Sequence, residues 1–224
     1  MIDHTLLRAD ATRGDIRKLC REAEECGFGA VCVNSAYVAL AARELQGSPV
    51  KVCTVIGFPL GATSVAGKAA EAKQAASDGA VEFDMVINLG ALKEGDVTYL
   101  EGEVGEVVAS ARSVRGDATV KIILETALLT DNEKLLGCRV AVSRGAGFVK
   151  TSTGFGPGGA TVEDVRLLRN AVGGAVGVKA SGGIRDLATA LRMVSAGANR
   201  IGTSSGVQII KQWRDNAILE PEGV

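Results

Sequence analysis

The sequence contains little histidine, few aromatic residues and no cysteine pair at the spacing of a metal or redox motif. His4 is its only histidine, Phe, Trp and Tyr together make up 4% of it, and none of its five cysteines forms a C-x-x-C pair. An ordinary zinc site therefore has no ligand set, and we expect neither a metal nor another cofactor. An odd number of cysteines without a signal-peptide pattern is typical of the reducing cytoplasm, the location that we expect.

The chain also lacks an excess of charge and a long apolar run. Its 25 basic and 26 acidic residues give a formal net charge of -1, which offers no general attraction for nucleic acid or an anionic membrane surface. No apolar run reaches the roughly 18 residues that cross a bilayer. We therefore expect neither nucleic acid nor a membrane as a partner.

Glycine, by contrast, is abundant, and it punctuates a recurring unit of amphipathic helix, turn and apolar strand. The 29 glycines are about twice the usual share of roughly 7%. Glycine just past a helix supplies a left-handed cap, as we expect at Gly27, Gly79, Gly145 and Gly197. The strands predicted after these turns are residues 30–34, 81–88, 147–152 and 200–204. Residues 51–58, 119–126 and 176–181 add three more, and residues 2–6 a weaker eighth.

Eight strands in 224 residues correspond to 224/8 = 28 residues per unit, the length of a compact βα repeat. Near-continuous apolar strands indicate a parallel sheet that is covered on both faces. The sequence therefore predicts an α/β protein with a (β/α)8 TIM barrel, in one domain over residues 1–224 because no linker divides it. An open doubly wound sheet is the alternative, but neither its G-x-G-x-x-G turn nor a Walker motif is present.

Two lysines, Lys150 and Lys179, interrupt apolar strands. A buried ammonium costs several kcal/mol in effective terms unless it is paired or functional. Desolvation and a nearby second cation both favour the neutral form of an amine, which is the form that attacks a carbonyl group. Asp84 also interrupts a predicted strand. Instead of a catalytic role, it could have a structural one, as the partner of Lys121 or Lys179 in a buried ion pair.

Further polar residues lie where the predicted strands end, which in a barrel is the catalytic face. They include Asp3, Asn34, Asn88 and Glu125. Cys32 is more often a buried packing residue than a nucleophile, and packing is the role expected of the other four cysteines.

Three loops rich in glycine follow the last three predicted strands. Barrels of this type commonly bind phosphate after strands seven and eight, through backbone N–H groups and a helix N-terminus. The loops therefore predict a phosphorylated small substrate, although such glycines also serve simple tight turns. The expected phosphate-binding residues are Gly154, Gly182, Gly183, Gly202, Ser204 and Ser205. Arg185 is a further source of charge, although an arginine in the first turn of a helix is more often solvated.

Residues 2–7, 55–61, 149–154 and 178–185 resemble the motifs of deoxyribose-phosphate aldolase, with F-V-K-T-S-T-G and V-K-A-S-G-G-I-R as the most specific. The resemblance runs from residue 2 to about residue 211. It implies a class I aldolase that reversibly cleaves 2-deoxy-D-ribose 5-phosphate to D-glyceraldehyde 3-phosphate and acetaldehyde, in deoxyribonucleotide catabolism. Lys150 matches the Schiff-base lysine, Lys179 the second lysine and Asp84 the proton-transfer carboxylate. Asp3 and Cys32 match the family's active-site aspartate and cysteine, and the loop residues named above match its phosphate-binding residues. We expect Lys121 and Thr151 to bind the substrate as well.

Three features depart from the family pattern. The segment that usually precedes the first strand is short or missing, so we expect the floor of the barrel to be exposed or covered by another subunit. Tyrosines occur only at Tyr37 and Tyr99, which leaves no candidate for the terminal tyrosine of some members. Phe155 stands where some relatives have a lysine near the phosphate. The resemblance also makes a homodimer or higher homo-oligomer possible.

Two other functions fit parts of the pattern. Another Schiff-base aldolase or a transaldolase would share the barrel and one lysine. A catalytically silent phosphosugar-binding protein would need the glycine loops but not both strand lysines.

Overall fold

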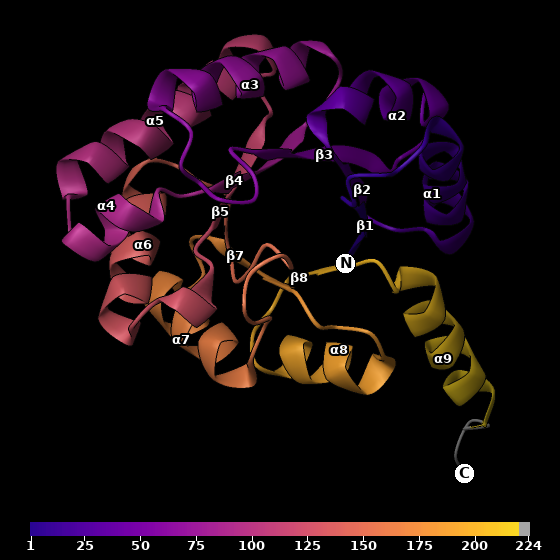
Figure 1. Cartoon of the computed structure of the whole chain (residues 1–224). Helices are drawn as coiled ribbons and strands as arrows, with labels where there is room; N and C mark the ends of the chain where they lie inside the picture. Colours follow the sequence, from indigo (N-terminus) through magenta and orange to yellow (C-terminus); the bar gives the residue numbers. More distant parts are fainter. Residues whose placement is uncertain (220–224) are drawn as a thin grey trace.

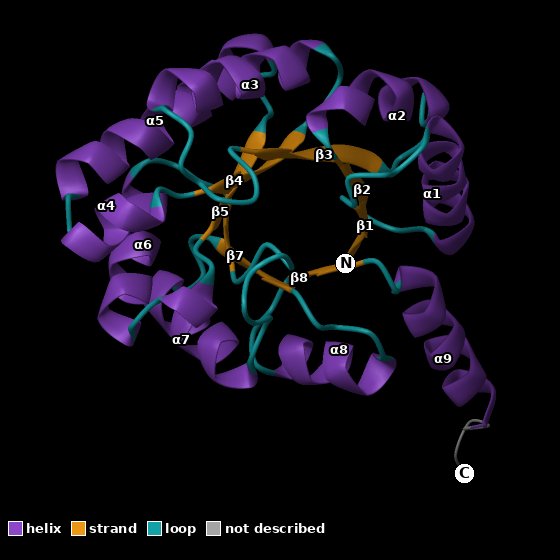
Figure 2. Ribbon diagram, viewed as in Figure 1, coloured by secondary structure: helices purple, strands orange, loops and turns teal. Residues whose placement is uncertain are grey.

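The eight predicted strands form one closed parallel barrel in the computed structural model, which describes residues 1–219. Each strand pairs with its neighbours in sequence order, and β8 closes the ring on β1 (Figure 2). The (β/α)8 prediction is therefore confirmed. The strands are β1 Ile2–Leu6, β2 Ala30–Val33, β3 Lys51–Ile56, β4 Glu82–Val86, β5 Thr119–Ile123, β6 Phe148–Lys150, β7 Gly177–Ser181 and β8 Arg200–Thr203.

Helices form a ring around this barrel, and in the described part of the chain every strand is followed by at least one of them (Figure 1). The α-helices are α1 Arg13–Cys26, α2 Val38–Glu44, α3 Val65–Ser77, α4 Leu89–Glu94, α5 Val97–Val114, α6 Asp131–Ser143, α7 Val162–Val172, α8 Leu187–Ser195 and α9 Gly206–Leu219. Two short 3₁₀ turns are η1 Ser35–Tyr37 and η2 Thr126–Leu128. No helix within residues 1–219 is both long enough and apolar enough to cross a bilayer.

Local sequence signals explain where the helices begin and end. Thr12 and Asp15 form a reciprocal capping box at the start of α1, so that two backbone N–H groups are satisfied there. The four glycines predicted in the αβ turns all have positive φ, from 64° at Gly27 to 113° at Gly197. These turns reverse the chain tightly because glycine adopts the left-handed region without a steric penalty.

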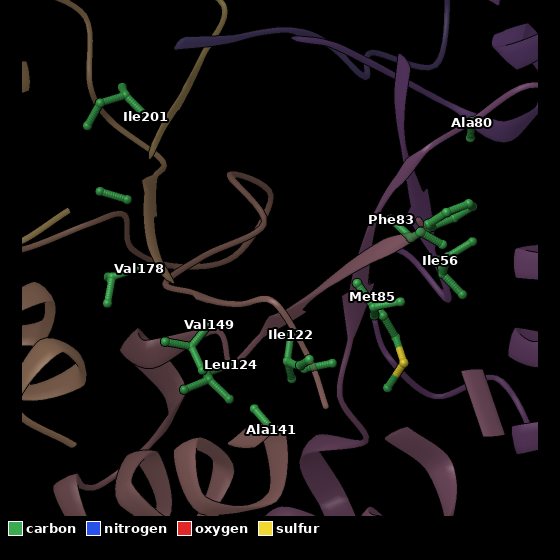
Figure 3. Close-up of a cluster of buried hydrophobic side chains, with 14 of the residues drawn as sticks. Ile56, Ala80, Phe83, Met85, Ile122, Leu124, Ala141, Val149, Val178 and Ile201 are labelled. Carbon is green, nitrogen blue, oxygen red and sulfur yellow. The ribbon is translucent and has the colours of Figure 1, made fainter. Parts of the chain in front are cut away.

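The two faces of the strands carry different side chains. The outward face is apolar and packs against the helices, as Figure 3 shows for Phe83, Met85, Ile122, Val149 and Val178. These residues alternate along the strands with inward side chains that are mostly polar or charged. The main hydrophobic core therefore lies between the barrel and the helices, and the inside of the barrel is left for other chemistry.

Several predicted strands extended too far at their carboxyl ends. Residues 81–88 were predicted as one strand, but β4 ends at Val86, and the Asn88 side chain caps α4 by accepting a hydrogen bond from Ala91 N. The error arises because Ile87 and Leu124 are buried and apolar, although they lie beyond the strand ends. The expectation that nothing here replaces the terminal tyrosine of some family members concerns the end of the chain, which lies outside the described residues.

Candidate active site

The charged side chains inside the barrel lie in three successive layers, which come alternately from even and odd strands. The middle layer comes from the odd strands and consists of Asp3, Cys53, Lys121 and Lys179. Lys179 Nζ lies 2.5 Å from Asp3 Oδ2, and Lys121 Nζ lies 3.2 Å from Cys53 Sγ. The layer above it comes from the even strands and consists of Cys32, Asp84, Lys150 and Gly202. The layer below, also from even strands, consists of Ala30, Glu82, Phe148 and Arg200. Such layering is usual in these barrels, but branched apolar residues normally dominate it.

Asp84 joins the three lysines of the site. Its Oδ2 accepts hydrogen bonds from Lys150 and Lys179, at 2.8 and 2.7 Å. Its Oδ1 accepts from Lys121 at 2.8 Å. Burial alone would raise the pKa of Asp84, but the surrounding lysine side chains, Lys121 first, outweigh it and hold that pKa well below the usual range. The carboxylate therefore stays ionised. It forms the ion pairs of the structural alternative, with both Lys121 and Lys179, and contacts Lys150 as well, so its role in proton transfer remains a prediction.

Lys179 and Lys121 lie deep among carboxylates. Burial opposes the charge on Lys179, but Asp3 and Asp84 reverse this and raise its pKa. The pKa of Lys121 is raised well above its usual value in the same way, with Asp84, Cys53, Asp3 and Glu82 overcoming its burial. Both side chains are therefore fixed cations.

Lys150 differs from these two lysines in its surroundings. Its Nζ has one carboxylate within 4.0 Å among the described residues, Asp84, and shares that oxygen with Lys179. Its side chain is 3% exposed and lines the cavity above the barrel. Lys150 is therefore the lysine of the cluster that a small molecule can reach.

The cavity at the carboxyl ends of the strands has a volume of about 340 Å³. Its wall brings together Lys150 and most of the predicted loop residues. A Cβ on Gly182 would lie 2.9 Å from Gly159 Cα, so this close approach of two loops requires glycine. The predicted residues that line the cavity are Lys150, Gly154, Gly182, Gly183, Gly202 and Ser204, and Arg8, Thr153, Phe155 and Arg185 line it as well.

The other predicted site residues lie outside the wall of this cavity. Asp3, Cys32 and Lys121 are fully buried inside the barrel. Thr151 Oγ1 donates to Ser181 O and accepts from Ser181 N, which ties β6 to β7. Ser205 N donates to Thr203 Oγ1 just before α9 begins. Direct contacts between these residues and a substrate remain predictions.

Sequence reasoning missed three side chains of the interior network. Glu82 Oε2 lies 2.8 Å from Lys121 Nζ, and Arg200 Nη1 lies 2.6 Å from Asp3 Oδ1. Cys53, expected only to pack, donates from Sγ to Asp84 Oδ1 at 3.2 Å. The period of two along a strand could have identified Glu82, which lies two residues before Asp84 and therefore on the same face.

Glu125 forms a second buried polar feature, next to the cavity loop. It is the one non-glycine residue with positive φ among residues 1–219, at 54°. Its buried Oε2 accepts hydrogen bonds from both the backbone N–H and the hydroxyl of Thr153, and Oε1 has no hydrogen-bond partner among the described residues. Thr153 Oγ1 in turn accepts from Phe155 N. Glu125 therefore holds residues 153–155 in the cavity wall.

Replacing Glu125 by glycine should loosen this loop, because glycine suits the left-handed backbone but removes the carboxylate. We expect amide hydrogen exchange in residues 151–160 to accelerate about tenfold or more, as loss of a hydrogen bond to a charged group implies. Glu125→Gln is the matched control, because its amide oxygen still accepts from Thr153. Equal rates of amide hydrogen exchange in Glu125→Gly and the wild type would contradict the conclusion that Glu125 holds residues 153–155 in place.

Two sets of three potential metal ligands also meet inside the barrel, which the sequence spacing did not reveal. They are Cys32, Cys53 and Asp84, and Asp3, Cys53 and Glu82, with ligand atoms within 4.8 Å of one another. Their carboxylates already pair with lysine or arginine side chains. A metal ion would therefore have to displace or repel those cations, and the expectation of a metal-free site remains a prediction.

A parallel barrel whose cavity leads to a reachable lysine in an ion-pair network has the architecture of a barrel enzyme that uses an amine nucleophile. Comparison with protein families matches residues 1–212 to the DeoC/LacD family aldolases. The chain therefore belongs to the DeoC/LacD family of aldolases. The family resemblance seen in the sequence is confirmed.

Individual relatives agree with this assignment. The chain is 54% identical over 218 residues to the deoxyribose-phosphate aldolase of Caldanaerobacter subterraneus subsp. tengcongensis, covering 97% of this chain and 94% of the relative. It is 58% identical over 211 residues to that of Carboxydothermus hydrogenoformans, covering 94% and 92%. A solved tetrameric structure of deoxyribose phosphate aldolase from Aeropyrum pernix superposes with a TM-score of 0.89 at 37% identity, covering 96% of this chain and 90% of that one.

Proposed function

We propose that this protein is a class I aldolase that reversibly cleaves 2-deoxy-D-ribose 5-phosphate to D-glyceraldehyde 3-phosphate and acetaldehyde. The observation that carries the proposal is Lys150, which contacts Asp84 at 2.8 Å and lines the cavity. The relatives that are more than half identical over nearly the whole chain carry the name of this activity. Deoxyribonucleotide catabolism is the process that such a reaction serves.

The reaction begins when the free amine of Lys150 attacks the C1 aldehyde of the open-chain sugar. Loss of water from the carbinolamine gives an iminium, which withdraws electrons and allows the C2–C3 bond to break. D-Glyceraldehyde 3-phosphate leaves, and the remaining enamine is protonated at C2 and hydrolysed to acetaldehyde. Asp84 lies within hydrogen-bond reach of Lys150 and is placed to pass protons through these steps.

Lys179 and Lys121 stay charged while Lys150 reacts. Because Asp3 and Asp84 hold the charge of Lys179, this lysine stays an ammonium beside the attacking amine. A neighbouring cation disfavours a second one, which increases the neutral fraction of the nucleophile. Lys150 is therefore the nucleophile, and Lys179 supplies the positive charge beside it.

The phosphate group of the substrate would bind at the loop residues of the cavity wall. Gly182 and Gly183 have φ of 88° and 77° and line the wall beside Ser204, which precedes the N-terminus of the 14-residue helix α9. Phe155, 55% exposed, offers no charge and packs edge to face on Phe58 with ring centroids 5.3 Å apart. Arg8 and Arg185 line the same cavity, and we assign to them the positive charge that position 155 lacks.

Product analysis tests the proposed activity. Purified protein incubated with 2-deoxy-D-ribose 5-phosphate should release acetaldehyde and D-glyceraldehyde 3-phosphate in equal amounts, at a rate unchanged by a chelator. A transaldolase would instead transfer a ketose fragment to an acceptor aldehyde, and a binding protein would release nothing.

A comparison of sugars tests the phosphate anchor. Because the anchor is remote from the reacting carbons, its binding energy orients the substrate, and we expect kcat/KM for unphosphorylated 2-deoxy-D-ribose to be lower by about 10²-fold or more. The matched variant Ser204→Ala should weaken only the reaction of the phosphorylated sugar. Equal kcat/KM values for the two sugars would refute the anchor.

The partners that follow are a small phosphorylated sugar and acetaldehyde. The Aeropyrum pernix relative is described as tetrameric, and we propose a homo-oligomer here, with the cytoplasm as its location. At the starts of the strands Arg200 and Lys51 are 15% and 53% exposed. This supports the hypothesis that the barrel floor is open or covered by another subunit.

A further inference from the structure

The inside of the barrel contains more positive than negative side chains. Its three carboxylates are Asp3, Glu82 and Asp84, and its four cations are Lys121, Lys150, Lys179 and Arg200. When all seven are ionised, the sum is 4 − 3 = +1 within residues 1–219. An uncompensated charge is costly in a buried site, so one cation of this set is under pressure to lose its proton.

The distribution of partners decides which cation that is. Arg200 contacts Asp3 and Glu82, with its Nη1 2.6 and 3.3 Å from their carboxylate oxygens. Lys121 and Lys179 likewise each lie within 4.0 Å of two or more carboxylates. Lys150 has only Asp84 among the described residues, through an oxygen that also accepts from Lys179. Lys150 is therefore the group of this set whose positive charge the carboxylates compensate least, and the one that we expect to lose its proton.

Arg200 is the group that creates this surplus. Without it, three lysines would face three carboxylates, and Lys150 could remain an ammonium in a neutral network. Arg200 is fixed at the lower layer of the barrel by Asp3 and Glu82, and its guanidinium lies 5.6 Å from the centroid of the Phe148 ring. Lys51 also reaches Glu82, at 3.4 Å, but it is 53% exposed and solvent screens its charge.

We infer that Arg200 is a positioning residue that keeps Lys150 in its free amine form. It lies two layers below Lys150 and pairs with the carboxylates of Asp3 and Glu82, whose negative charge it compensates. Arg200 acts through the ion-pair chain Arg200, Asp3, Lys179, Asp84 and Lys150, whose links are 2.5 to 2.8 Å long. The expected effect of Arg200 on the reactivity of the Lys150 amine follows from this charge arrangement alone. Its consequence for catalysis rests on the proposed aldolase function.

Every other strand also presents a titratable group to this network. These groups are Asp3 from β1, Cys32 from β2, Cys53 from β3, Glu82 and Asp84 from β4, Lys121 from β5, Lys179 from β7 and Arg200 from β8. Burial raises the pKa of Cys53 well above its usual value, so this thiol adds no charge. A hydrogen bond from Cys53 lowers the pKa of Cys32, against the effect of burial. Each variant below is therefore also made in a Cys32→Ala background, which removes that group from the count.

The reactivity of Lys150 toward trace acetic anhydride, mapped by peptide mass spectrometry from pH 5 to pH 10, measures its free amine without any substrate. In Arg200→Met the pH of half-maximal labelling should rise by about one unit, the order of effect that one charge has in a medium of effective dielectric constant near 20. Arg200→Lys keeps the charge and should label like the wild type. Glu82→Gln removes a negative charge and should shift the labelling to lower pH.

The double variant Arg200→Met/Glu82→Gln restores the charge balance and should return close to the wild-type profile. An unchanged profile in folded Arg200→Met, or a shift of Glu82→Gln to higher pH, would overturn the inference. If Arg200→Met does not fold, the sign of the Glu82→Gln shift decides the question. An inactive wild type would refute the proposed aldolase function alone, because the labelling needs no catalysis.

Discussion

Replacing Lys150 by alanine is expected to lower kcat/KM for cleavage of 2-deoxy-D-ribose 5-phosphate by about 10⁴-fold or more. The substitution removes the only amine of the buried cluster that lines the cavity, so no iminium can form there. Loss of a covalent nucleophile typically has effects of this size. Steady-state kinetics with a coupled assay for either product would measure it.

Two controls separate lost chemistry from lost structure. Lys150→Arg retains a long side chain that can donate to Asp84 but supplies no nucleophilic amine, and it should be as inactive as Lys150→Ala. Lys73→Ala removes an exposed lysine of α3 and should leave the rate unchanged. Residual activity in Lys150→Arg above about one per cent of the wild type would contradict the assignment of the nucleophile.

Replacing Asp84 by asparagine should affect both activity and stability. The amide cannot balance Lys121, Lys150 and Lys179, which all donate to the native carboxylate. Breaking a buried ion pair from one side costs about 3–5 kcal/mol in the free energy of unfolding. Loss of the proposed proton-transfer group should lower kcat by about 10²-fold or more. Urea unfolding and single-turnover kinetics would measure the two effects separately.

The stability effect of Asp84→Asn should depend on pH with a defined sign. The folded pKa of Asp84 lies well below its unfolded value of about 3.9. Its contribution is therefore fully present above pH ~3.9 and is lost as the pH falls through the folded pKa. The difference between wild type and variant should be constant between pH 5 and pH 7 and shrink below about pH 3.9. A difference that grew on acidification would contradict the ionised Asp84, and Asp117→Asn, at an exposed site, should show little change at any pH.

The fold was largely predictable because each βα unit carries its own signals. Gly27 and Gly197 mark helix ends, and the apolar runs that follow them are buried on both faces, so that strand order follows chain order in a closed barrel. The strand ends were less predictable, since hydrophobicity continues past the last ladder residue at Ile87 and Leu124. Only hydrogen bonding, such as the cap that Asn88 provides for α4, fixes those ends.

The candidate site was predictable in part. Lys150, Lys179 and Asp84 stand out because charged residues rarely interrupt core strands. Their mutual contacts were not predictable, because these depend on the stagger of the strands around the barrel, which places Asp84 opposite Lys121 and Lys150 opposite Lys179. Arg200 was missed for the same reason. It begins a strand next to a turn, where an arginine is more often exposed than buried.

Borohydride trapping is the most direct test of the central claim that Lys150 forms the Schiff base. The protein is incubated with acetaldehyde or 2-deoxy-D-ribose 5-phosphate, reduced, digested and mapped by mass spectrometry, with Lys150→Ala and Lys179→Ala in parallel. The structure predicts a single adduct on Lys150, absent from Lys150→Ala and formed more slowly in Lys179→Ala. An adduct on Lys179 in the wild type, or no adduct on either lysine, would contradict the account.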